Sequence, residues 1–263
     1  MRASGIDISH HQGELDLHAG QLDFAILRAG YGRMPDRRFD QYVHAAKGVP
    51  ARGARNIPRG AYHYFSSAVP WREQAQFFLA RVDGLGFDFY ALDFEPAFNH
   101  KSAGFADGAR KWLEEVKAAA GKPVLLYTNP STYETWLRPF GDWMDNWPLW
   151  VAQYPSRSWT AWVAGIKSTL TRQPWLPKGR ADWTIWQYSA DGNRQGPAHG
   201  VSSPDVDLNV WNGAVEDMLA WLAIAPKDEE IPHEQPDYAP VFHQLRRKLD
   251  EARALIPQEH KEG

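Results

Sequence analysis

Short apolar runs that end in polar or turn residues recur along most of the chain. Runs of this length, rich in branched and aromatic residues and bounded by turn residues, are typical of buried β-strands. The pattern predicts strands at residues 5–9, 24–30, 60–65, 89–95, 123–129, 149–154, 183–189 and 206–211.

Helical patterns lie between the earlier strands, with apolar residues at three- and four-residue steps. They predict helices at residues 39–48, 71–84, 102–122, 131–137 and 213–224. Near-continuous apolar strands that alternate with helices favour a parallel sheet covered on both faces. Eight strands favour a barrel over an open sheet, and the helical pattern fades after the fifth strand. We therefore expect an irregular α/β barrel.

The composition changes at the end of this body. Residues 226–240 hold four prolines and five acids and are interpreted as a linker. Residues 241–263 follow, and apolar residues at helical spacing within 241–256 predict an amphipathic helix. The expected organisation is a domain at 1–225, a linker at 226–240 and a C-terminal helix and tail at 241–263.

Charge and composition exclude several classes of protein. Residues 1–225 carry 23 acidic and 23 basic side chains, so the neutral body gives no reason to expect nucleic acid or an anionic membrane as a partner. No apolar run is long enough for a membrane span, and the N-terminus has no apolar leader, so we expect neither membrane insertion nor a signal peptide. The chain has no cysteine. A monomer is the default expectation.

Aromatic residues are unusually frequent, with 13 Trp and 10 Tyr. One interpretation is a tryptophan-rich core. The other is a cleft lined with aromatic faces that stack on sugar rings, which the absence of a basic patch favours over nucleic-acid bases.

The run "FYALDFEP" at residues 89–96 places Asp93 and Glu95 on one face at the end of a predicted strand. The carboxyl ends of barrel strands open onto the active site. Asp7 lies in the first strand and Asp207 in the last, and these two strands become neighbours if the barrel closes. Four crowded acids cannot all ionise, so one would keep a proton at neutral pH, as glycosidases require.

Other interpretations of the acids remain open at this point. Arg28 or Arg59 could form an internal salt bridge with Asp93 and Glu95 from neighbouring strands. A metal site is disfavoured because the histidines lack ligand spacing, and His63 is better explained as a packed core residue. No Gly-rich phosphate loop and no Gly-x-Ser-x-Gly motif occur, so we expect no cofactor, no metal and no serine nucleophile.

Seven motifs together resemble glycoside hydrolase family 25, the muramidases or Chalaropsis-type lysozymes. They are "GIDISHHQG", "GAYHYF", "LDFEP", "PVLLYTN", "LWVAQY", "WTIWQYS" and "VDLN", in the order that the family has them, across residues 4–213. The resemblance implies an irregular TIM-like (β/α)5(β)3 barrel that cleaves the β-1,4 bond between N-acetylmuramic acid and N-acetylglucosamine in peptidoglycan.

The resemblance also implies roles for individual residues. Glu95 would be the general acid, and Asp93 would orient the substrate acetamido group, while Asp7 and Asp207 would line the same pocket. The implied substrate-binding residues are Tyr62, Tyr127, Trp150 and Gln187. Participation of the acetamido oxygen is the mechanism favoured here, although the spacing of the acids leaves retention and inversion open.

Two alternatives of function and two settings stay open. The chain could be a non-catalytic carbohydrate-binding module, or a glycosidase for another N-acetylated polymer such as chitin. A phage or prophage endolysin is the expected setting, and a secreted enzyme whose leader was removed is the rival. The segment from Pro155 to Arg180 is longer than the family's usual connection, and its Trp159, Trp162 and Trp175 could extend the cleft or pack on the surface.

Overall fold

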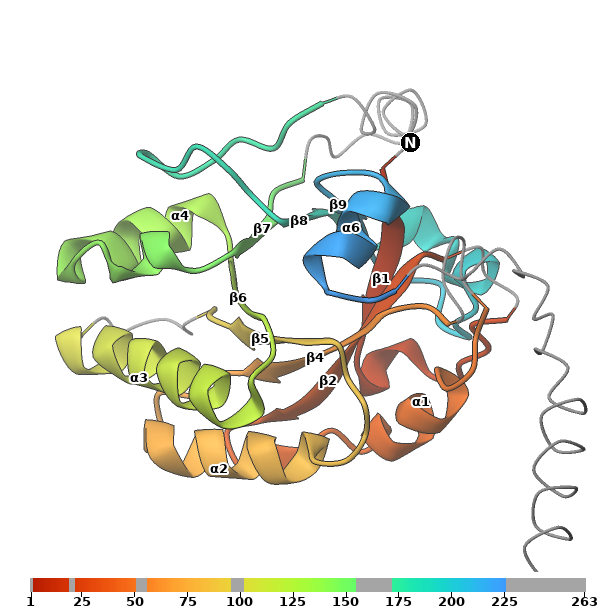
Figure 1. Ribbon diagram of the computed structural model, residues 1–263, viewed down its shortest axis with the longest axis horizontal. Helices are drawn as coiled ribbons and strands as arrows, with labels where there is room; N and C mark the ends of the chain where they lie inside the picture. The colour runs from red at the N-terminus through yellow and green to blue at the C-terminus, as the bar shows by residue number, and fades with distance from the viewer. Residues whose placement is uncertain (1, 19–21, 51–55, 96–101, 155–171, 226–263) are drawn as a thin grey trace, which may run out of the picture. The chain divides into compact units, whose positions relative to one another are not determined.

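The computed structural model describes residues 2–18, 22–50, 56–95, 102–154 and 172–225 (Figure 1). Their strands agree closely with the predicted ones, with one short addition, β3. The strands are β1 (Ser4–Ile8), β2 (Phe24–Tyr31), β3 (Met34–Pro35), β4 (Arg59–Tyr64), β5 (Phe89–Asp93), β6 (Val124–Thr128), β7 (Leu149–Ala152), β8 (Ile185–Ser189) and β9 (Asp207–Trp211).

Eight of these strands form a closed barrel. The order is β1-β9-β8-β7-β6-β5-β4-β2, and a further pairing of β1 with β2 closes the ring, while β3 forms a hairpin with β2. The pairs from β1–β2 round to β7–β8 are parallel. The expectation of a parallel sheet fails at one strand, because β9 pairs antiparallel with both β8 and β1.

The helices lie on the outside of the barrel, where α1, α2, α3 and α4 follow one another in an arc (Figure 1). Between β7 and α6, the only helical elements of the described residues are short 3₁₀ turns, as the fading helical pattern predicted. The irregular (β/α)5(β)3 barrel is therefore confirmed. The helices are α1 (Phe39–Ala45), α2 (Trp71–Val82), α3 (Ala103–Ala120), α4 (Pro130–Thr132, continued by a π turn at Tyr133–Leu137) and α6 (Val215–Trp221).

Alternation along each strand divides the apolar side chains into two layers. One layer packs the outer face of the strands against the helices, and the other fills the barrel interior. At the end of the barrel where the parallel strands begin, the interior is packed so tightly that residue 60 has to be glycine. A Cβ at this position would lie 2.4 Å from the Phe89 ring. Val215, Met218 and Leu219 of α6 join this inner layer and cover the end of the barrel where the parallel strands begin.

Local signals explain where α3 begins and ends. The Ser102 side chain accepts a hydrogen bond from the Phe105 backbone N–H, and Gly121 adopts the left-handed conformation (φ 61°) just after the last turn. Both satisfy backbone groups that a helix leaves unpaired at its ends.

His63 is a packed core residue, as expected. Its side chain is fully buried, its ring stacks on Trp112 with centroids 5.6 Å apart, and its Nε2 lies 3.2 Å from Oε1 of Gln74. Gln74 also bonds the backbone of Ser66 and Val69, which fixes the connection from β4 to α2.

Several expectations concern segments outside the described residues. These are the linker at 226–240, the helix and tail at 241–263, and Trp159 and Trp162. Trp175 is described, and two thirds of it is exposed (67%). Among the described residues, no helix is both long enough and apolar enough to cross a bilayer.

Candidate active site

The end of β5 presents two carboxyl groups to the mouth of the barrel. Asp93 is the last residue of the strand and is 5% exposed, and Glu95 follows it, half-buried. Leu92, just before Asp93, and Phe94, between the two acids, point the other way, into the apolar layer under the helices. The i, i+2 alternation of a strand therefore delivers both acids to one side, as predicted from the sequence.

Asp7 and Asp207 lie opposite each other in the register of β1 and β9. Their side chains share a hydrogen bond. Asp7 is buried, and its Oδ2 also accepts hydrogen bonds from Nε2 of Gln187 (2.8 Å) and Nδ2 of Asn209 (2.7 Å). The amide donors of Gln187 and Asn209 favour the ionised form of Asp7, whereas burial and the charge of Asp7 raise the pKa of Asp207 well above its usual range.

The reversal of β9 is what brings Asp207 to the mouth. Asp207 is the first residue of its strand. In a parallel strand a first residue would lie at the opposite end of the barrel, but in an antiparallel strand it lies beside the carboxyl ends of its neighbours. Sequence reasoning thus located Asp207 correctly without the strand direction that puts it there.

Burial and crowding raise the pKa of each acid above its usual range. For Glu95 the pKa rises through burial and the charge of Asp7, partly offset by a hydrogen bond from Tyr127. Burial, then the charges of Glu95 and Asp7, raise the pKa of Asp93 further, and its Oδ1 has no hydrogen-bond partner among the described residues. Burial and crowding therefore favour the protonated forms of these acids.

The internal salt bridge considered for Asp93 and Glu95 does not form. Arg28 instead pairs with Asp36, its Nε 2.9 Å from Oδ2, and Arg59 donates to the backbone oxygens of Leu85 and Gly86. Within the described part of the chain, none of the four acids has an ion-pair partner. The acids therefore have no direct ion pair with any described cation, and the charge of Arg28, which lowers the pKa of Asp93, is outweighed by burial and by the neighbouring acids.

The predicted substrate-binding aromatics form a buried layer directly under the acids. Tyr62, Tyr127 and Trp150 are 7%, 6% and 1% exposed, and the Trp150 ring lies 4.5 Å from Tyr127 and 6.0 Å from Tyr62. Gln187, 3% exposed, accepts from the Tyr127 hydroxyl at 2.9 Å. The Trp150 ring plane is inclined by 60° to that of Tyr127 and by 88° to that of Tyr62, so the three rings pack edge to face.

Three further residues complete the site and were not singled out from the sequence. Asn209 is fully buried and connects Asp7 to Trp150, whose Nε1 donates to its Oδ1 at 2.8 Å. Tyr154, 48% exposed, donates to Oε1 of Gln187, and Tyr64 donates to the Glu95 carbonyl oxygen. Strand alternation could have indicated Asn209, since it shares a face with Asp207.

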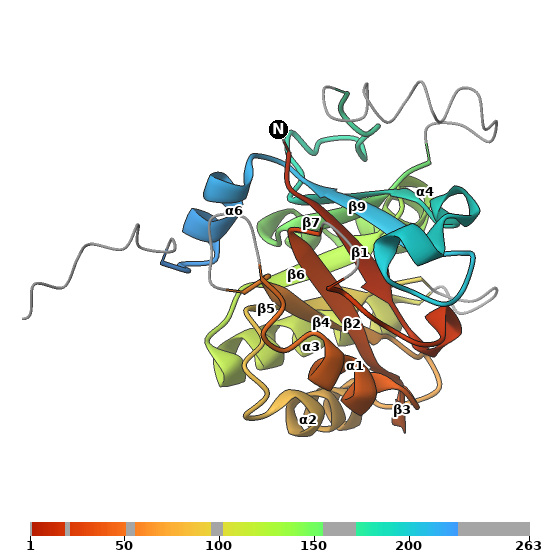
Figure 2. The same cartoon turned by 90° about the vertical axis from the view of Figure 1, so that its right-hand side faces the viewer.

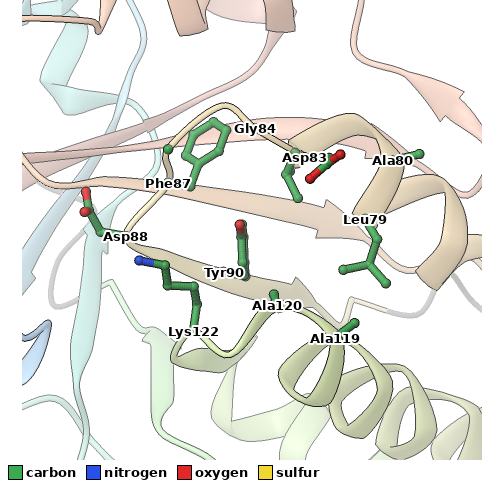
Figure 3. A pocket seen from close by; sticks show the side chains of 12 residues that line it. Leu79, Ala80, Asp83, Gly84, Phe87, Asp88, Tyr90, Ala119, Ala120 and Lys122 are labelled. Atoms are coloured by element: carbon green, nitrogen blue, oxygen red, sulfur yellow. The ribbon is translucent and has the colours of Figure 1, made fainter.

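Two cavities help to locate the site. One, of about 530 Å³, has Glu95 and Tyr64 in its wall and is continuous with the mouth. The other, of about 590 Å³, lies between the C-terminal ends of α2 and α3, near Asp88 and Lys122 (Figure 3). Asp88 precedes β5, so this second cavity lies at the far end of the barrel from the acids. Over the described residues, no group of three or more acids and histidines has the arrangement of a metal site.

A closed barrel with crowded acids at one mouth has the groups that a glycoside hydrolase needs. The sequence matches the model of the glycosyl hydrolases family 25 over residues 6–197, and the chain belongs to this family. The resemblance seen in the motifs is thereby confirmed, and the chain is an enzyme of the glycoside hydrolase class.

Individual relatives agree with this assignment. Lysozyme M1 of Streptomyces globisporus is 30% identical over 232 residues, which are 82% of this chain and 70% of that protein. The bacterial lysozyme of Streptomyces coelicolor has a similar structure, with a TM-score of 0.61 and 26% identity over 84% of this chain and 96% of that one. The family GH25 lysozyme of Aspergillus fumigatus gives a TM-score of 0.65 at 23% identity, over 85% of this chain and 100% of that one.

Proposed function

We propose that this enzyme is a peptidoglycan muramidase that hydrolyses the β-1,4 bond from N-acetylmuramic acid to N-acetylglucosamine. The observation that carries the proposal is the group of Asp7, Asp93, Glu95 and Asp207 at one mouth with raised pKa values. Family membership and the lysozyme relatives support peptidoglycan as the polymer. The site of action is then the bacterial cell wall.

Glu95 is the general acid of the proposal, because it is half-buried, opens onto a cavity and has a raised pKa. Its proton goes to the glycosidic oxygen as the bond from that oxygen to C1 breaks. The carbonyl oxygen of the sugar's own acetamido group bonds to C1 in the same step. Water then attacks C1 and gives a proton back to Glu95, which restores the enzyme and retains the configuration at C1.

Asp93 would orient the acetamido group for its attack on C1. The oxygen that would do so is Oδ1, which has no hydrogen-bond partner among the described residues. An acetamido N–H that donates to this oxygen favours the ionised form of Asp93 and lowers its pKa. A proton shared between the two coupled carboxyls then moves to Glu95, where the reaction needs it. The substrate thereby completes a hydrogen bond that the free enzyme lacks.

Asp7 and Asp207 would set the charge around this pair. Ionised Asp7, held by Gln187 and Asn209, raises the pKa of Glu95 and so keeps the acid protonated. The hydroxyl groups and ring edges of Tyr62 and Tyr127 would line the floor beneath the sugar, with Trp150 packed against both rings.

Glu95→Gln tests the assignment of the acid. We expect release of reducing ends from purified peptidoglycan to fall about 100- to 10,000-fold, as removal of a general acid does, with sedimentation onto the wall retained. Glu115→Gln is the matched control, because Glu115 is exposed on α3. Full activity of Glu95→Gln would remove Glu95 as the acid. Mass spectrometry of the products tests the bond, which requires muramic acid at the new reducing end.

A further inference from the structure

The cavity beside Glu95 extends beyond the four acids, toward the end of β1 and the hairpin of β2 and β3. Its wall includes His10, His11, Arg28, Tyr31, Met34 and Arg37, in addition to Glu95 itself. A group bound at the acids could therefore extend into this space without leaving the enzyme surface.

Two arginines, Arg28 and Arg37, line this cavity together with two acids, Asp36 and Glu95. Asp36 forms an ion pair with Arg28 and contacts the His10 ring. It also accepts hydrogen bonds from the backbone N–H groups of His10 and Arg38. Arg37 is exposed and makes no ion pair with any residue that the structure describes. An uncompensated guanidinium thus faces a cavity whose neighbouring mouth is acidic.

The same wall also has an apolar part. Met34 is 60% exposed and Tyr31 39%, although both are large apolar side chains. The Tyr31 ring packs edge-on against Tyr64 with centroids 5.1 Å apart, so its position is fixed by the site itself. Exposed apolar side chains beside an unpaired cation match a ligand that has both methyl groups and a negative charge.

The chemistry of the polymer limits which part of it fits this wall. N-acetylated sugars are neutral and need no guanidinium, whereas the short peptide on the lactyl group of muramic acid carries carboxylates and alanine methyl groups. We propose that this cavity binds the stem peptide of peptidoglycan, with a peptide carboxylate on Arg37 and methyl groups against Met34 and Tyr31. The proposal depends on the muramidase function proposed above.

The test compares two substrates with the full-length enzyme. One is intact peptidoglycan, and the other is glycan stripped of peptides by an amidase, which keeps the lactyl carboxylate. Arg37→Gln should lower kcat/KM on intact peptidoglycan about fivefold, the upper range for one exposed ion pair, and chiefly through KM. Arg37→Lys should restore most of it. Arg33→Gln is the matched control, since exposed Arg33 pairs with Glu73 outside the cavity wall.

The outcomes separate the proposals. A loss with Arg37→Gln that is several-fold greater on intact than on stripped substrate, and that shrinks at high salt, supports binding of the stem. An equal loss on both substrates assigns Arg37 to the glycan or its lactyl group and overturns the proposal, as does no loss at all. Wild-type enzyme that releases no reducing ends from either substrate refutes the muramidase function instead.

Discussion

Asn209→Leu tests the most buried polar contact of the site. The substitution keeps the volume of a fully buried side chain but removes both of its hydrogen bonds, to Asp7 Oδ2 at 2.7 Å and from Trp150 Nε1 at 2.8 Å. A hydrogen bond to a charged group contributes about 1.5–3 kcal/mol, and a buried donor left unpaired costs about 1–3 kcal/mol. Burial of the apolar leucine side chain offsets part of this loss of stability. We expect the free energy of unfolding to fall by about 2–4 kcal/mol.

The loss should depend on pH. Hydrogen bonds from Asn209 favour ionised Asp7 and lower its folded-state pKa relative to the variant. Their stabilisation is therefore present when Asp7 is ionised and is lost as the pH falls and Asp7 takes up a proton. Urea unfolding followed by circular dichroism at pH 8 and pH 5 measures this, with the larger deficit expected at pH 8.

Two controls make this result specific. Asn146→Leu, at an exposed position, should change stability by less than about 0.5 kcal/mol. Trp150→Phe removes the donor to Asn209, so the double variant with Asn209→Leu should lose less than the two single losses combined. A deficit below about 1 kcal/mol at both pH values, with additive single losses, would refute the coupling described here.

Four further predictions concern the titration of two residues, packing and the product. Burial lowers the pKa of His63 from 6.5 to about 4, so at pH values between these two the histidine is protonated in the unfolded chain but not in the folded one. The free energy of unfolding should therefore fall by at most about 3 kcal/mol as the pH drops from 6.5 toward 4. His63→Phe should reduce this pH dependence, measured by urea unfolding. Burial and neighbouring charges raise the pKa of Asp93, so its ionisation opposes folding as the pH rises, and Asp93→Asn should unfold at higher urea at pH 7 while losing activity. Gly60→Ala should cost about 1–3 kcal/mol through the Phe89 ring, measured by thermal unfolding against Gly104→Ala, where a Cβ meets nothing. Proton NMR of the first product should show retention at C1, and initial inversion would exclude acetamido participation.

Alternation and strand order made much of the fold and site predictable. Asp93 and Glu95 fall two residues apart at a strand end, and apolar runs identified all eight barrel strands. The closure of the ring then follows from strand number, and Asp7 meets Asp207 because first and last strands pair. These are local or topological properties, which a sequence pattern carries directly.

Contacts that depend on register or on loops were not predictable in the same way. The direction of β9 is invisible in its apolar pattern, which is the same in either orientation. Tyr154, which follows β7, donates a hydrogen bond to Gln187. Asp36, which follows β3, forms the ion pair with Arg28 that the sequence suggested for the acids of the site. Both contacts depend on how a segment beyond the end of a strand folds back, which the apolar pattern does not encode.

The direction of β9 also determines where the described body begins and ends. A strand that descends from the mouth returns the chain to the level at which β1 starts, and Ala3 exchanges backbone hydrogen bonds with Trp211 and Gly213 there. Ala3 and Gly213 thus lie next to each other, at the end of the barrel away from the acids. A short peptide could join them and new termini could be opened in a surface loop, so this barrel is suited to circular permutation and to fusions that leave its cleft unobstructed.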